Sequence, residues 1–154
     1  MKNLSQQNYI SQVSIDCVIF GYHDRQLKVL IPKINFKGNF WALPSGFVYQ
    51  HEDIDQAAER ILLERTGIHD IYLEQFRVFG KASRTNKAFL DELIELNPEK
   101  LGEKSIVQQQ EYDWFMKRFI SVGYYALVDI NKVVPQKTDL DESIEWYSIH
   151  SLPE

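Results

Sequence analysis

The sequence contains little of what marks a secreted, metal-binding or membrane protein. It has a single cysteine, Cys17, so no intramolecular disulfide can form, which suits a reducing cytoplasm. Its histidines show no metal-site spacing, and there is no paired-cysteine motif and no glycine-rich Walker loop. No apolar run approaches the roughly 18 residues that a membrane span requires, and the N-terminal segment MKNLSQQNYI has no apolar signal core. These absences predict a cytoplasmic protein with no membrane partner.

The sequence also lacks an excess of basic residues. Lys and Arg together number 17 against 22 Asp and Glu, so the net charge is -5 and the chain as a whole is not built as an electrostatic nucleic-acid binder. A length of 154 residues and a hydrophobic content of 44% suffice for one core. We therefore predict a single domain over residues 1–154.

The hydrophobic pattern predicts strands around one long helix. Segments rich in β-branched and aromatic residues predict strands at 13–22, 27–31, 41–43, 71–80, 119–130 and 144–149. The first two form a hairpin through the polar stretch 22–25, and Pro32 should end the second strand or lie at its edge. The segment 119–130 is almost entirely apolar, which favours a central position in the sheet.

The helix is predicted over residues 53–65. An apolar stripe at helical spacing consists of Ile54, Ala57, Ala58, Ile61 and Leu62. Asp53 favours the N-terminal end of the helix dipole, and Gly67 is a typical C-terminal stop.

Residues 84–116 form an insertion between two predicted strands. An apolar pattern from Phe89 to Leu96 predicts a helix that ends at Asn97-Pro98, and a second helix is predicted after Gly102. Two interpretations stand side by side: the helical pair covers one rim of a functional site, or it is a surface elaboration without a functional role.

The stretch GFVYQHEDIDQAAERILLERTGI carries the most specific pattern in the chain. It resembles the Nudix box, whose family pattern is G-x5-E-x7-R-E-U-x-E-E-x-G-U, with U a bulky aliphatic residue. The matching positions are Gly46, Glu52, Arg60, Leu62, Glu64, Gly67 and Ile68. Two family glutamates are replaced, one by Ile61 and the other by Arg65.

The resemblance implies an α/β/α Nudix sandwich with a mixed sheet. Family members hydrolyse nucleoside diphosphates linked to another group, using magnesium held by glutamates of the box helix. Such ions neutralise the pyrophosphate and activate water. If this chain is active, the resemblance makes Glu64 and Glu52 its metal ligands and catalytic residues. Arg60 and Gly67 take structural roles, with Arg60 bracing the loop and helix by ion pairing.

The two departures bear directly on that chemistry. At about 100° per residue, positions 61, 64 and 65 share one side of the helix. Glutamates in all three positions would carry a formal charge of about -3, whereas Ile61, Glu64 and Arg65 sum to zero. Glu64 is either a remnant metal ligand or the partner of Arg65, which could pair with Glu64 or Glu52.

The segments ALPSGFV, AAERILLERTGI, YLEQF and RFISVGYYALV are similar to one branch of the family. They resemble the Nudix-related transcriptional regulators, in which a Nudix-like domain senses a nucleotide or sugar effector and a C-terminal winged helix binds DNA. No winged helix follows in this chain, so we expect either a piece cut at a domain boundary or a shortened relative. Any DNA contact is expected only through a domain outside these residues.

These observations predict an effector-binding domain of a transcriptional regulator with weak or no hydrolase activity. The ligand, a nucleotide-sugar such as ADP-ribose, or a sugar, would lie between the box loop and the insertion in a homodimeric protein. The predicted ligand-binding residues are Ser45, Gly46, Arg65, Arg84 and Arg118. Two alternatives remain. One is a magnesium-dependent hydrolase completed by Glu74, Glu111 or Asp113, and the other is a dimerisation module with an empty pocket.

Overall fold

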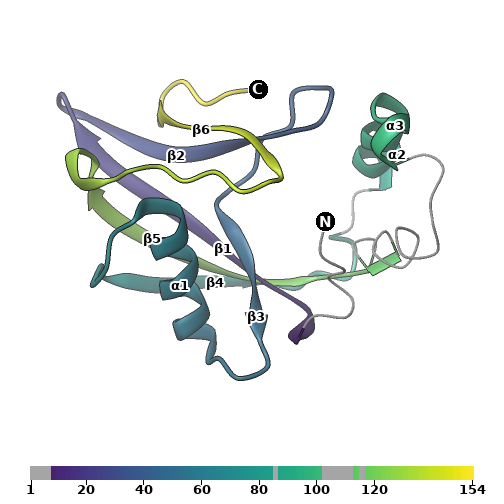
Figure 1. Cartoon of the computed structure of the whole chain (residues 1–154), viewed down its shortest axis with the longest axis horizontal. Helices are drawn as coiled ribbons and strands as arrows, with labels where there is room; N and C mark the ends of the chain where they lie inside the picture. The colour runs from purple at the N-terminus through teal and green to yellow at the C-terminus, as the bar shows by residue number, and fades with distance from the viewer. Residues whose placement is uncertain (1–7, 85–86, 102–112, 115–116) are drawn as a thin grey trace.

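The computed structural model describes residues 8–84, 87–101, 113–114 and 117–154 (Figure 1). In chain order the elements are β1 (Tyr9–His23), β2 (Gln26–Ile34), β3 (Ser45–Tyr49), α1 (Ile54–Thr66), β4 (Leu73–Phe79), α2 (Lys87–Leu96), α3 (Pro98–Leu101), β5 (Ile120–Asp129), the short 3-10 helix η2 (Ile130–Lys132) and β6 (Asp141–Ser148).

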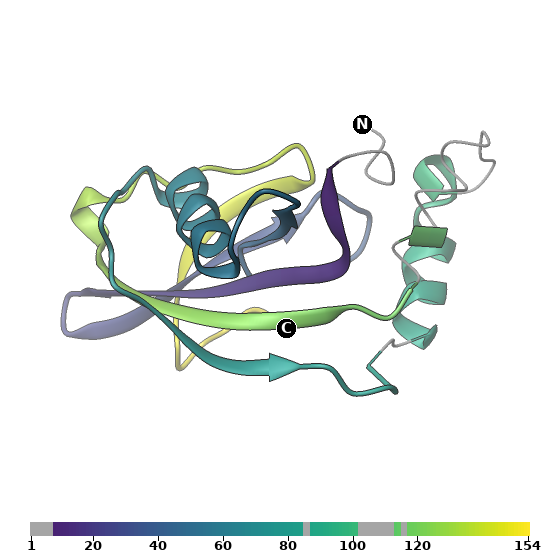
Figure 2. The same cartoon turned by 90° about the horizontal axis from the view of Figure 1, so that it is seen from below.

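The strands form one mixed sheet with β1 at its centre. The order is β4-β5-β1-β2-β6, and β3 pairs with the first part of β1. The β1–β5 pair is parallel and the other pairs are antiparallel. Helix α1 covers one face of this sheet, and α2 and α3 stand beyond one end of it (Figure 2). The predicted α/β sandwich with a mixed sheet and an inserted helix is confirmed.

The predicted β1–β2 hairpin is present, with a two-residue turn. Asp24 and Arg25 have φ angles of 49° and 60°, the left-handed geometry that matches strand twist in such turns. Strand β2 continues past Pro32 to Ile34, so Pro32 does not end the strand. It does lie in an edge-like segment, because β2 beyond Val29 pairs with β6 alone among the named strands.

The predicted strand at 41–43 is wrong. Only Trp41 makes an isolated bridge, with Lys33, and the strand that pairs with β1 begins at Ser45. Pro44 lies between them and lacks an N–H group, but its carbonyl accepts a hydrogen bond from the Cys17 amide at 2.8 Å. Strand β3 thus begins just after the proline, at Ser45, four residues later than the predicted start at Trp41.

Helix α1 begins and ends at the predicted signals. The Asp53 amide donates to the Gln56 side chain at 2.9 Å, and Gly67 closes the helix with a left-handed φ of 72°. The stripe is buried from Ala57 onward, whereas Ile54 in the first turn is 42% exposed. The stripe packs on β1 around Cys17, whose burial raises the pKa of its thiol to about 12, so this cysteine is a packing residue.

The inserted segment is described only in part. Helix α2 ends at Leu96, just before Asn97-Pro98 as predicted. The second predicted helix falls mostly on residues 102–112 and 115–116, outside the described residues. Trp114, which is described, is buried and packs edge-on against Phe47 and Phe119, with ring centroids 4.9 Å from each.

None of the helices within the described ranges is long and apolar enough to cross a membrane.

Candidate functional site

Arg60 is the centre of the box cluster. Its Nε donates to Glu52 Oε1 at 2.6 Å and its Nη2 donates to Glu52 Oε2 at 3.0 Å. The same Nη2 donates to the Phe47 carbonyl at 2.7 Å, and the guanidinium lies over the Tyr49 ring, 4.6 Å from its centroid. Arg60 therefore ties β3, the following loop and α1 together, the bracing role that the resemblance implies.

Glu52 and Glu64 are both engaged by this arginine. The hydrogen bonds from Arg60 hold the pKa of the Glu52 carboxyl below its usual value, and the Tyr49 amide also donates to it, at 3.0 Å. Glu64, with a side chain 56% exposed, lies 3.4 Å from Arg60 Nη1. Both carboxylate oxygens of Glu52 thus accept hydrogen bonds from the protein, and the exposed carboxylate of Glu64 faces the Arg60 guanidinium.

This donor set does not fit a magnesium ion, which requires several oxygen ligands. Within the described part of the chain, no group of three or more His, Cys, Asp or Glu side chains could hold a metal. Glu74 accepts hydrogen bonds from Tyr72 and Tyr125 on the β4 edge, Asp113 is exposed, and Glu111 lies outside the described residues.

Ile61 is a core residue packed against Gly46. Its side chain is 1% exposed, and a Cβ added at Gly46 would lie 2.8 Å from both Ile61 Cγ1 and Cδ1. Gly46 therefore faces α1, and its missing side chain accommodates the helix. The prediction that Gly46 binds the ligand finds no support in this packing.

Arg65 is the clearest departure from prediction. The residue is 4% exposed, and its Nη1 donates to Asp141 Oδ2 at 2.6 Å and to the Gln136 carbonyl at 3.3 Å. The prediction that it pairs with Glu64 or Glu52 is wrong, because Asp141 of β6 is its partner. A guanidinium buried in this pair has no surface to offer a ligand, so Arg65 does not join the candidate ligand contacts.

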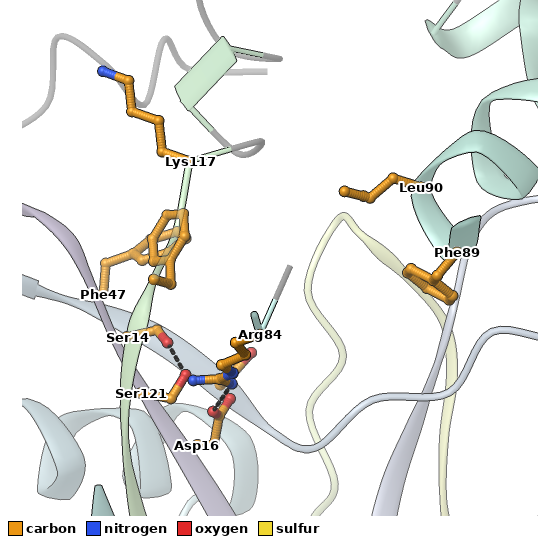
Figure 3. A pocket seen from close by; sticks show the side chains of 10 residues that line it. Ser14, Asp16, Phe47, Arg84, Phe89, Leu90, Lys117 and Ser121 are labelled. Carbon is orange, nitrogen blue, oxygen red and sulfur yellow. Dashed lines mark hydrogen bonds and ion pairs between the residues drawn. The ribbon is translucent and has the colours of Figure 1, made fainter. Parts of the chain in front are cut away.

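A cleft of about 360 Å³ lies between the sheet and the inserted helix α2 (Figure 3). Strands β1, β3 and β5 supply its floor and α2 supplies the opposite wall. Its lining residues are Ser14, Asp16, Ser45, Phe47, Arg84, Phe89, Leu90, Lys117, Phe119 and Ser121.

The cleft opens on the sheet face opposite α1. In the strand register, Asp16 lies opposite Ser45 of β3. Ser14 lies opposite Phe47 of β3 on one side and opposite Ser121 of β5 on the other. Side chains alternate along a strand, so these residues face away from the α1 side, where Ile15 and Cys17 are fully buried in the core. Ser45 and Gly46 are neighbours in sequence but serve opposite faces.

The predicted ligand residues are therefore divided by the structure. Ser45 and Arg84 line the cleft, whereas Arg118 is exposed and its neighbour Lys117 lines the cleft instead. Sequence reasoning missed the polar floor, Ser14, Asp16 and Ser121. The alternation of Ile15 and Cys17 with Ser14 and Asp16 was the available signal for two of these residues.

The cleft combines cations, hydroxyl groups and aromatic rings. It has two cations, Arg84 and Lys117, against one carboxylate, Asp16, in a chain whose net charge is -5. The Ser14 and Ser121 hydroxyls are hydrogen-bonded to each other at 2.6 Å on its floor. Such a lining can bind an anionic ligand that also presents a flat apolar ring.

Asn97 fixes the helical wall to the body of the domain. This residue is 2% exposed; its side-chain amide accepts from the Lys37 amide at 2.5 Å and donates to the Lys37 carbonyl at 3.0 Å. Phe89 of α2 also packs edge-on against Phe40, with ring centroids 5.3 Å apart. The described half of the insertion is thus an anchored wall of the cleft, and its functional role stays a prediction.

Comparisons with known proteins agree with this architecture. The family model described as the NUDIX domain matches residues 11–154. The ADPR responsive transcriptional repressor NtrR of Acinetobacter baylyi is 41% identical over 76 residues, a match that spans 47% of this chain and 30% of that repressor.

Solved structures of similar fold include the NUDIX domain of Shewanella oneidensis NrtR complexed with ADP ribose. That structure has a TM-score of 0.60 and 23% identity, over 92% of this chain and 75% of that one. A MutT/nudix family protein from Enterococcus faecalis has a TM-score of 0.59 and 21% identity, over 90% of this chain and 44% of its own. Both likenesses concern the fold.

Proposed function

Because this chain belongs to the NUDIX domain family, we propose that it is the effector-binding domain of a transcriptional regulator with weak or no hydrolase activity. Its ligand is a nucleotide-sugar of the ADP-ribose type, a nucleoside diphosphate linked to a sugar, and the ligand lies in the cleft between the sheet and α2. The relatives named for ADP-ribose support this ligand class.

One observation carries the proposal: the box acids and the cleft are separate. Arg60 engages both Glu52 and Glu64, while the cleft on the other face of the sheet has cations and rings. The cleft supports a binding role, and among the described residues no group of three or more candidate ligands supports metal-assisted hydrolysis. A diphosphate suits Arg84 and Lys117, since charge-assisted hydrogen bonds to phosphate are strong. A nucleobase suits Phe47, Phe89 and Phe119.

The proposal extends to the setting of the domain. DNA contact is proposed only through a domain outside these residues, because the net charge of residues 1–154 is -5. Cys17 is free and buried, as suits a cytoplasmic protein. The proposal includes a homodimer, and light scattering after gel filtration tests this oligomeric state. It includes magnesium only if hydrolysis occurs.

Calorimetric titration with ADP-ribose, with and without magnesium, tests the function when the same samples are then analysed for products. We expect binding that magnesium does not alter and ligand recovered intact. The variant Phe89→Ala should bind more weakly, because it removes a ring from the cleft wall. Tyr72→Ala is the matched control, because Tyr72 lies just before β4 and is 74% exposed.

Other results would select the alternatives. Magnesium-dependent release of AMP would identify a hydrolase that recruits acids such as Glu74, Glu111 or Asp113. The absence of binding to any nucleotide-sugar would contradict the sensor and favour the dimerisation module.

A further inference from the structure

The polar floor of the cleft contains the carboxylate of Asp16, which would repel a diphosphate placed beside it. Asp16 projects from β1 into the cleft, with Ser45 beside it on β3 and Gly123 beside it on β5. We propose that Asp16 binds the hydroxyl pair of a ribose and that Arg84, its present partner, turns to the ligand's phosphate. This inference rests on the proposed function, since it requires that the cleft bind a nucleotide.

Asp16 has the chemistry for hydroxyl donors. An ionised carboxylate only accepts hydrogen bonds, and its two oxygens match the two O–H donors of a ribose diol. Acidic side chains bind ribose hydroxyls in this way in dinucleotide sites of other folds. The neighbouring hydroxyls of Ser14 and Ser121 are bonded to each other, so Asp16 is the principal acceptor that the floor presents.

Arg84 is held for an exchange of partners. Its Nη1 donates to the Phe79 carbonyl at 2.9 Å, which fixes the guanidinium at the cleft wall. Its Nη2 lies 3.7 Å from Asp16 Oδ2, longer than a hydrogen bond (Figure 3). Nη2 can therefore turn to a phosphate oxygen while Nη1 keeps its hydrogen bond to the Phe79 carbonyl. Asp16 is then free to accept hydrogen bonds from the ribose hydroxyls.

A structural role explains this pair less well. The two side chains are 36% and 26% exposed, and ion pairs of such exposure add little to folding stability. The arrangement instead gives the ligand a direction, with phosphates toward Arg84 and Lys117 and ribose toward Asp16. A ligand inserted the other way would set phosphate against carboxylate.

The first test measures ADP-ribose binding to Asp16→Asn by calorimetry. We expect affinity to fall by about 10- to 100-fold, the loss for a hydrogen bond to a charged group. Asp24→Asn, an exposed aspartate at the hairpin turn, should bind like the wild type. Wild-type affinity in Asp16→Asn would overturn the inference and leave the proposed function intact, whereas a wild type that binds no nucleotide would overturn both.

A second ligand assigns the loss to the hydroxyls. The dideoxy analogue of ADP lacks both ribose hydroxyls, so the wild type and Asp16→Asn should bind it equally, while ADP should distinguish them. Equal losses for ADP and its dideoxy analogue would overturn the ribose assignment.

Arg84→Gln tests the exchange. The variant should bind ADP-ribose more weakly, because the ligand loses a phosphate partner. Its affinity for adenosine should not fall, because adenosine has no phosphate and meets an unpaired Asp16. An equal loss for both ligands would overturn the exchange and make Arg84 a general part of the wall.

Discussion

Arg65 lies in the last turn of α1, with its guanidinium buried against the segment that leads into β6. Its ion pair with Asp141 is accompanied by two further hydrogen bonds to the same carboxylate oxygen, from the Thr138 amide at 2.7 Å and the Thr138 hydroxyl at 3.0 Å. The backbone repeats the link, because the Gln136 amide donates to the Arg65 carbonyl at 2.9 Å. Arg65 therefore fastens the end of the box helix to the last strand.

Removal of one partner should destabilise the fold strongly. Asp141→Ala leaves a buried cation and two Thr138 donors unpaired, and breaking such a pair costs about 3–5 kcal/mol. Urea denaturation followed by tryptophan fluorescence measures the change. Glu142→Ala is the matched control, because it breaks the adjacent, exposed pair with Lys33 and should cost about 0–1 kcal/mol. Equal effects of the two substitutions would contradict the structural role.

At this scale the sequence shows which residues depart from the box but not what they do. The cation at position 65 is visible beside Glu64, and a local partner is the natural expectation. Its actual partner lies 76 residues away in the chain. The partner of a helical side chain depends on how the whole helix packs. The spacing of residues along the helix does not determine it.

Among the elements, α1 and β3 approach closely at Gly46. Gly46→Ala should destabilise the domain by about 1–3 kcal/mol, the usual cost of overpacking, because its Cβ would lie 2.8 Å from Ile61. The double variant Gly46→Ala with Ile61→Ala should be more stable than the sum of the single effects predicts. Thermal denaturation of all four proteins measures this coupling, and strict additivity would refute the contact.

The inserted helix depends on Asn97 in a comparable way. Asn97→Ala removes a buried side chain and its two hydrogen bonds to the Lys37 backbone, each worth about 0.5–1.5 kcal/mol. Because α2 forms a wall of the cleft, ADP-ribose affinity should fall with it. Lys37→Gln is the control, since it removes only the exposed ion pair with Glu99 and keeps both backbone bonds. Unchanged ligand affinity in Asn97→Ala would show that the wall does not need this anchor.

Elements with local signals were predictable from the sequence. Helix α1 has its cap and its glycine stop, and the hairpin has its polar turn, so both were located within a few residues. The start of β3 was misplaced because Trp41 and Leu43 have a strand composition, whereas the pairing with β1 begins only after Pro44. Strand pairing is a long-range property that composition does not contain.

For the whole molecule, the two faces of the sheet have separate tasks. One face packs on α1 around Ile15, Cys17 and Ile19, and the other carries the cleft. Sequence reasoning expected the ligand between the box loop and the insertion, and the cleft does lie between β3 and α2. It could not assign Ser45 and Gly46 to different faces, because that requires the register of β3 against β1.

The distribution of charge leads to a prediction about DNA. The net charge is -5, and the two cations of the cleft face a carboxylate and a pocket suited to one small ligand. DNA binding depends on many phosphate contacts made by a basic surface. Residues 1–154 alone should therefore not retard a DNA duplex at about 0.15 M salt, where surface charges are screened beyond about 8 Å. A gel-shift titration with a protein sample that binds ADP-ribose measures this. Retardation of a specific duplex by that sample would show that the domain itself contacts DNA. It would contradict the proposal that DNA contact requires a separate domain.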